Sequence, residues 1–186
     1  MKNILEYILF ISLSLFVRII GLKFSRRFAN VLAFVFFYII RIRKEVVLEN
    51  LKYAFPDYSE EKIKHTAYEN FKSICITLVE ILSLPWIKKE QVNNILLFDN
   101  PDLFINKFKE GNGLIVLSGH FGNWEYLATL GAYILQVKFH VVVKPQRNPY
   151  VDRWMNSYRT KWNNEVIALG PSIRNVYSVL IKRGIL

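Results

Sequence analysis

The sequence predicts an α/β fold, in which apolar helices at the N-terminus precede a core of parallel strands that alternate with helices. In the first half of the chain, apolar residues recur at three- and four-residue steps, as on one face of a helix. After Gly111, short runs rich in β-branched residues alternate with helical patterns, which is typical of parallel βαβ units. The chain has 186 residues, enough for one domain with a buried core.

Residues 1–44 contain two apolar runs, each followed by basic residues. The runs cover residues 4–17 and 28–40. Each is shorter than the roughly 20 residues that span a bilayer. We therefore expect one or two membrane anchors, either shallow or barely spanning, whose basic flanks meet anionic headgroups. A pair of buried core helices is the alternative. A cleaved signal peptide is disfavoured, because no small-residue cleavage site follows.

The composition favours an anionic partner. Hydrophobic residues make up 52% of the chain and the net charge is +10. Such a chain suits a membrane, a nucleic acid or an acidic protein. Nucleic acid is disfavoured, because no RNA-binding, helix-turn-helix or zinc pattern occurs and the N-terminal runs are apolar. A single cysteine, Cys75, excludes a disulfide framework, and three widely separated histidines disfavour a metal site.

Residues 45–186 are expected to form the α/β domain. Residues 45–56 read as a linker, and Ser59 is a candidate N-cap for a helix that Pro85 stops. Three short parallel strands would leave an open sheet edge, so we expect this domain to be incomplete at its C-terminus. The expected strands are residues 114–118, 139–143 and 166–169, and the expected helices are residues 123–136, 151–162 and one that Ser172 caps.

A histidine and a glutamate follow the first expected strand, in the segment GLIVLSGHFGNWE. Ligands bind at the carboxyl ends of strands in open α/β sheets, and Gly119 and Gly122 can supply the bend that brings His120 to Glu125. A carboxylate that fixes one imidazole nitrogen leaves the other free to take a proton from a substrate hydroxyl. The following helix N-terminus offers N–H groups to an oxyanion or a phosphate. His120 and Glu125 are therefore the candidate catalytic pair, with a purely structural pair as the alternative.

Basic residues follow the second expected strand. Such runs are usually solvated, but the carboxyl end of a strand also suits contact with a phosphate or an acidic carrier protein. Asn123 is expected to cap the helix that carries Glu125, with donation to an oxyanion as the alternative. The basic residues of this run are Lys144, Arg147, Arg153, Arg159 and Lys161.

HFGNWE and the apolar run before it resemble the His-x4-Asp/Glu motif of the lysophospholipid acyltransferase superfamily, especially its bacterial lipid A biosynthesis (lauroyl/myristoyl) branch. Three other stretches are similar to that branch. They are ENLKYAFPDYS, KPQRNPYVDRWMNSYR and SIRNVYSVLIKRG. With these stretches, the resemblance covers essentially the whole chain.

The resemblance implies an acyltransferase at the cytoplasmic face of the inner membrane of Gram-negative bacteria. It would move a fatty acyl group from acyl carrier protein to a hydroxyl of a lipid A precursor, without a further cofactor or metal. His120 would be the general base and Glu125 would orient it. Arg159 and Arg147 would hold a phosphate or the charge on the thioester carbonyl. Asn123 and Lys144 complete the expected substrate-binding set.

Two other functions remain open at this point. Members of the family continue beyond the point where this chain stops, so a catalytically inactive, truncated, membrane-associated lipid-binding remnant is one alternative. A hydrolase that uses water as acceptor shares the His–Glu pair and is the other. Turnover by the 186-residue chain would exclude the remnant. Release of free fatty acid without an acceptor lipid would favour the hydrolase.

Overall fold

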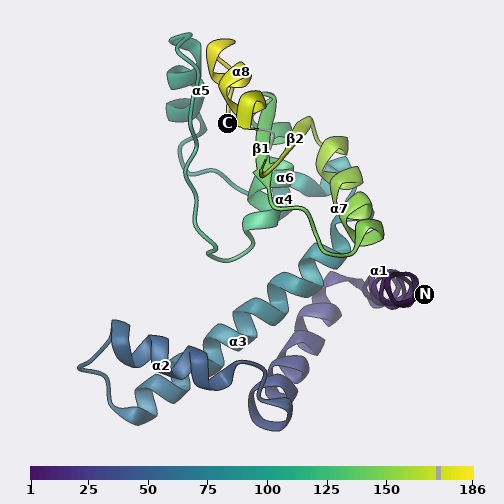
Figure 1. Ribbon diagram of the computed structural model, residues 1–186, viewed down its shortest axis with the longest axis vertical. Helices are drawn as coiled ribbons and strands as arrows, with labels where there is room; N and C mark the ends of the chain where they lie inside the picture. Colours follow the sequence, from purple (N-terminus) through teal and green to yellow (C-terminus); the bar gives the residue numbers. More distant parts are fainter. Residues whose placement is uncertain (171–172) are drawn as a thin grey trace. The chain divides into compact units, whose positions relative to one another are not determined.

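The computed structural model describes residues 1–170 and 173–186 of the chain (Figure 1). The chain packs into two units, Met1–Leu13 with Leu84–Leu186, and Ser14–Ser83. The expected helix cap at Ser172 lies outside the described residues. The division into an anchor, residues 1–44, and a catalytic domain, residues 45–186, stays a prediction.

One long helix, α1 (Lys2–Phe34), joins most of the two apolar runs, and a π-helical segment, Val35–Ile40, extends it. Gly21 interrupts α1 with a φ of 73° and a ψ of 159°, a backbone conformation that suits a residue without a Cβ. The stretch Lys2–Ile40 is long and apolar enough to cross a membrane, by length and composition. Only 11% of its most apolar window is buried, which disfavours the alternative of buried core helices.

In the Ser14–Ser83 unit, the predicted linker is wrong, because residues 44–54 form a helix, α2 (Lys44–Ala54). Val47, Leu48 and Leu51 stand at helical spacing and pack against a buried cluster, which explains why the segment is helical. The buried cluster comprises Val17, Ala29, Ala33, Phe37, Ala67, Phe71, Cys75 and Val79.

The predicted helix after Ser59 is confirmed as α3 (Glu60–Ser83). The Ser59 hydroxyl accepts a hydrogen bond from the Lys62 N–H at 3.3 Å, as an N-cap does. Buried residues recur every four positions along α3, from Ile63 through Phe71 to Val79. Within the same unit, the Arg26 side chain pairs with the buried Glu80 carboxylate at 2.6 Å.

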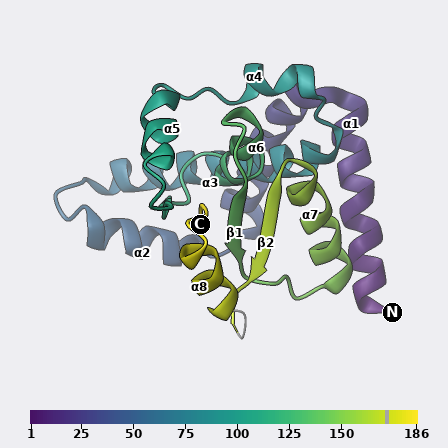
Figure 2. The same ribbon diagram turned by 90° about the horizontal axis from the view of Figure 1, so that it is seen from above.

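The predicted βαβ unit is confirmed. Strands β1 (Phe139–Val143) and β2 (Asn164–Ala168) are parallel, with Phe139 opposite Asn164 and Val143 opposite Ala168, and α7 (Pro149–Lys161) connects them. Figure 2 shows the two strands side by side, with α7 next to β2. Helix α6 (Trp124–Ile134) precedes β1, and α8 (Ile173–Ile181) follows β2.

The remaining described elements of this unit are short. Apolar residues of the segment 84–92 join α6 and α7 in one core, which contains Leu84, Ile87, Val92, Tyr126, Leu130, Tyr158 and Trp162. These elements are the 3-10 turns Leu84–Trp86 and Lys89–Gln91, and the helices α4 (Val92–Ile95) and α5 (Pro101–Lys109).

The predicted buried strand at residues 114–118 is wrong. Leu114 forms one isolated parallel bridge, to Ile185, which also bridges to β1. The backbone N–H of Val116 donates to Leu186, and Leu117 beyond it is 90% exposed. An apolar run predicts burial only if neighbouring segments cover it, and in the described structure that cover is limited to the first residues of the run.

Gly113 lies where this segment meets residues 183–184. Its φ is +74°, and a Cβ there would stand 2.9 Å from the Gly184 carbonyl oxygen. Gly111 has nearly the same φ, +73°, but a Cβ there would meet nothing within 4 Å. We expect Gly113→Ala to lower the free energy of unfolding by about 1–3 kcal/mol more than Gly111→Ala, because only Gly113→Ala adds a backbone clash. Denaturant titration measures both, and equal losses would contradict the close approach.

Candidate active site

His120 lies in the loop that leads into α6, and its side chain is exposed. Gly122, two residues later, has a positive φ of 52°, as the predicted bend requires. The imidazole packs against the indole of Trp124, with ring centroids 4.7 Å apart. An exposed imidazole is accessible to a substrate that approaches the start of α6.

Asn123 caps α6, as the sequence predicts. Its Oδ1 accepts a hydrogen bond from the N–H of Tyr126 at 2.8 Å. Glu125 stands in the first turn of the same helix, where the helix dipole favours an acid. The contact of Asn123 with substrate stays a prediction.

Glu125 and Arg159 form a buried ion pair between α6 and α7. The Arg159 Nε donates to Oε1 of Glu125 at 2.6 Å, and Nη2 donates to Oε2 at 3.0 Å. The two residues are 5% and 7% exposed. Two parallel hydrogen bonds in a buried site make this a rigid contact. It orients the carboxylate through an arginine 34 residues further along the chain.

The electrostatics of this pair favour its ionised form. Burial alone would lower the pKa of the Arg159 guanidinium, but the hydrogen bond and the charge of Glu125 outweigh it, so the pKa is raised. Burial also raises the pKa of the neighbouring Tyr158 phenol, and the charge of Glu125 raises it further. Tyr158 therefore stays neutral beside the ion pair at physiological pH.

A chain of hydrogen bonds extends from Arg159 to the loop after β1. Arg159 Nη1 donates to Oδ1 of Asn156 at 2.8 Å, and Nδ2 of Asn156 donates to Oδ2 of Asp152 at 3.1 Å. The other Asp152 oxygen accepts the backbone N–H of Gln146 at 2.7 Å. No sequence motif pointed to Asn156 or Asp152, although their spacing with Arg159 puts all three on one helical face.

Two predicted basic residues lie in the loop between β1 and α7. Lys144 and Arg147 are both exposed, at the carboxyl end of β1. The structure thus brings Arg159 to Glu125 and leaves Lys144 and Arg147 at the surface. In the described part of the chain it shows no hydrogen bond between His120 and Glu125.

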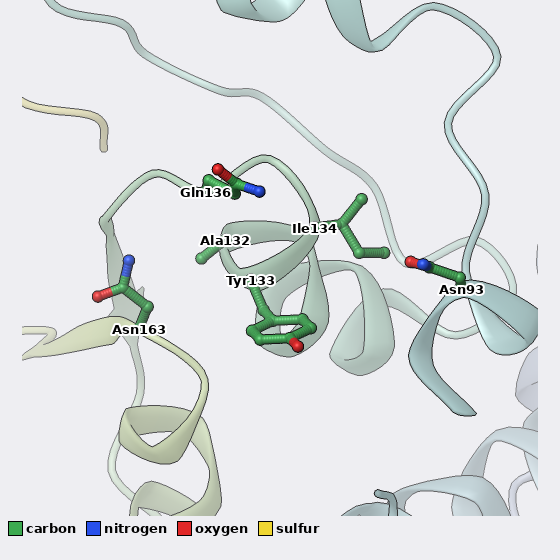
Figure 3. Close-up of a pocket in the computed structure, with 6 residues that line it drawn as sticks. All are labelled: Asn93, Ala132, Tyr133, Ile134, Gln136 and Asn163. Carbon is green, nitrogen blue, oxygen red and sulfur yellow. The ribbon is translucent and has the colours of Figure 1, made fainter. Parts of the chain in front are cut away.

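A cavity of about 520 Å³ opens at the opposite end of α6 from Glu125. Figure 3 shows Tyr133 and Ile134 at the end of that helix, with Gln136 and Asn163 beside it. The cavity is therefore separate from His120 and Glu125, the residues predicted to act in catalysis. Over residues 1–170 and 173–186, no cluster of three or more His, Cys, Asp or Glu could hold a metal ion.

The fold and site together define an α/β protein in which an exposed histidine precedes a helix whose first turn carries a fixed carboxylate. The family model of bacterial lipid A biosynthesis acyltransferases matches residues 2–184. The chain belongs to this family, which confirms the resemblance inferred from the sequence motifs. No curated protein and no solved structure gives a significant match.

Proposed function

We propose that the protein transfers a fatty acyl group from acyl carrier protein to a hydroxyl of a lipid A precursor. The observation that carries the proposal is membership of the lipid A acyltransferase family over residues 2–184. The exposure of His120 at the start of α6 supports it, since a general base must reach the substrate. The apolar helix α1 supports association with a membrane, which we propose to be the inner membrane at its cytoplasmic face.

In the proposed reaction, the His120 imidazole removes the proton from the acceptor hydroxyl as its oxygen attacks the thioester carbonyl carbon. A tetrahedral intermediate forms and its C–S bond then breaks. The departing thiolate takes the proton back from the imidazolium, so the products are the ester and the free thiol. Backbone N–H groups at the start of α6 are the proposed donors to the oxyanion.

Glu125 supplies a fixed negative charge close to His120 in the chain. Arg159 already donates to Glu125 and Asn156, so we assign it to positioning this carboxylate. A hydrogen bond from His120 to Glu125 is proposed for the substrate-bound state, because catalytic hydrogen bonds often tighten only there. Contact with the anionic substrate falls to the exposed Lys144 and Arg147, with Asn123 at the helix start.

Purified protein in detergent micelles, given acyl carrier protein loaded with a fatty acid and a lipid A precursor, tests this function. We expect mass spectrometry to show the precursor heavier by one acyl group and the carrier thiol set free. Parallel reactions with the coenzyme A thioester compare the two donors. Free fatty acid as the sole product would identify a hydrolase, and the absence of any turnover would contradict the proposed transfer.

A further inference from the structure

Asn148 joins the beginning of α1 to the beginning of α7, and both belong to the same unit. Its side-chain Nδ2 donates to the Asn3 carbonyl at 2.8 Å and to Oε2 of Glu6 at 3.1 Å. Its Oδ1 caps α7 by accepting the N–H of Tyr150 at 3.0 Å. Asn148 is 8% exposed, whereas the side chain of Glu6 is 48% exposed, so this joint is buried on the α7 side and open to solvent on the α1 side. It accounts for a carboxylate in the first apolar run of the sequence.

Two aromatic pairs continue the contact along the same faces of the two helices. Tyr7 lies 5.8 Å from Tyr150 and Phe10 lies 4.9 Å from Trp154, measured between ring centroids, and the second pair is edge to face. On α1 these residues follow Asn3 and Glu6 at helical spacing. One face of this part of α1 therefore packs against α7.

The opposite face of the same turns is apolar and uncovered. It presents branched aliphatic side chains in a pattern that continues over two turns of the helix. Their exposed fractions are 47% for Ile4, 64% for Leu5, 54% for Ile8 and 63% for Leu9. An exposed apolar row of this kind, with the exposed Lys2 at its start, is what a helix that lies in a membrane interface presents to the lipid.

The packing against α7 bears on whether residues 3–10 of α1 can cross a bilayer. The contact from Asn3 to Phe10 covers about 10 Å of helix axis, roughly a third of the hydrocarbon thickness. If α1 crossed the bilayer there, α7 would enter the hydrocarbon with it, including the Asp152 and Arg153 side chains. Charged side chains in that environment are unfavourable, which favours a helix that lies at the surface.

We propose that residues 2–13 lie along the surface of an anionic bilayer, with Ile4, Leu5, Ile8 and Leu9 in the lipid. In this arrangement the Asn148 joint holds the loop after β1, with Lys144 and Arg147, at the level of the headgroups. Lys144 and Arg147 are exposed and positively charged, so we expect this surface to bind a bilayer that contains anionic lipid. The inference goes beyond the proposed reaction and does not depend on turnover.

Spin-label depth measurements on vesicles of phosphatidylcholine and phosphatidylglycerol test the orientation. Single cysteines replace Leu5, Leu9 and Leu13 in a Cys75→Ala background, because Cys75 is the one native cysteine. A surface helix gives the three labels similar depths, whereas a crossing helix gives depths that increase by about 12 Å from the first to the third. Such a gradient would overturn the proposal. A label at Glu110, the exposed residue that follows α5, serves as the aqueous reference.

A charge exchange at the joint tests the role of Asn148. Asn148→Asp keeps the cap of α7 but removes the donor and sets a second carboxylate beside Glu6. We expect weaker binding to anionic vesicles, about 25-fold if both Lys144 and Arg147 leave the headgroups, at about five-fold for each charge. Glu6→Gln alone should bind normally, and Glu6→Gln with Asn148→Asp should recover binding, because the new amide donates to the new carboxylate. Unchanged binding by Asn148→Asp, or no recovery in the double variant, would contradict the proposed role of the contact between Asn148 and Glu6 in membrane binding.

Discussion

His120→Ala is expected to lower the rate constant for acyl transfer by about 10²–10⁴-fold, the range for loss of a general base. The loss should fall on kcat, because the imidazole acts on the proton that moves as the acyl group transfers. The fold should be unaffected, since the side chain is exposed and packs against the Trp124 ring. Rates of product formation and thermal unfolding, measured on the same preparation, separate these effects.

His65→Ala is the matched control for this variant. His65 is exposed on α3, and it lies in the other unit of the chain. We expect its transfer rate to equal that of the wild-type protein. A His120→Ala enzyme that matches the wild-type rate would contradict a base role for His120, whatever the control shows.

Arg159→Ala should destabilise the protein by about 3–5 kcal/mol, the cost of leaving a buried carboxylate without its partner. The two hydrogen bonds to Glu125 and the one to Asn156 are lost together. Arg159→Lys keeps the charge but cannot make the bidentate contact, so an intermediate loss is expected. Denaturant-induced unfolding measures the free energy of unfolding of the wild-type protein, Arg159→Ala and Arg159→Lys.

Arg153→Ala controls for removing an arginine from α7. Arg153 is exposed on the same helix, so its loss should change the free energy of unfolding by less than about 0.5 kcal/mol. Glu125→Gln with Arg159→Met removes both charges of the pair. It should recover part of the stability that Arg159→Ala loses, because no buried charge is left alone. Equal stability of Arg159→Ala and Arg153→Ala would contradict the claim that the fold depends on the buried pair of Glu125 and Arg159.

The sequence predicted the βαβ unit well, because its signals are local. The β-branched run at residues 139–143 and the helical pattern after it are readable without knowledge of their neighbours. The error at residues 114–118 has the opposite cause. Whether an apolar run becomes a buried strand depends on the segments that cover it, and periodicity carries no information about them. The linker error at α2 came from overlooking the spacing of Val47, Leu48 and Leu51.

The candidate site was predicted in its residues rather than in its contacts. Glu125 and Arg159 were both identified, but each was given a different partner from the one in the structure. Their contact joins two helices across 34 residues of sequence, and no spacing rule connects positions that far apart. Asn156 and Asp152 were missed, because a polar helical face is also what an ordinary solvated helix presents.

Chemical rescue of a His120→Gly variant tests the role of the histidine most directly. Glycine leaves the space of the exposed His120 side chain free for imidazole added to the solution. If the side chain acts as the base, added imidazole should restore acyl transfer to the lipid A precursor in a saturable way, and substituted imidazoles should restore it according to their pKa. A rate that does not respond to any imidazole, in a variant that still binds both substrates, would contradict general-base catalysis at this position.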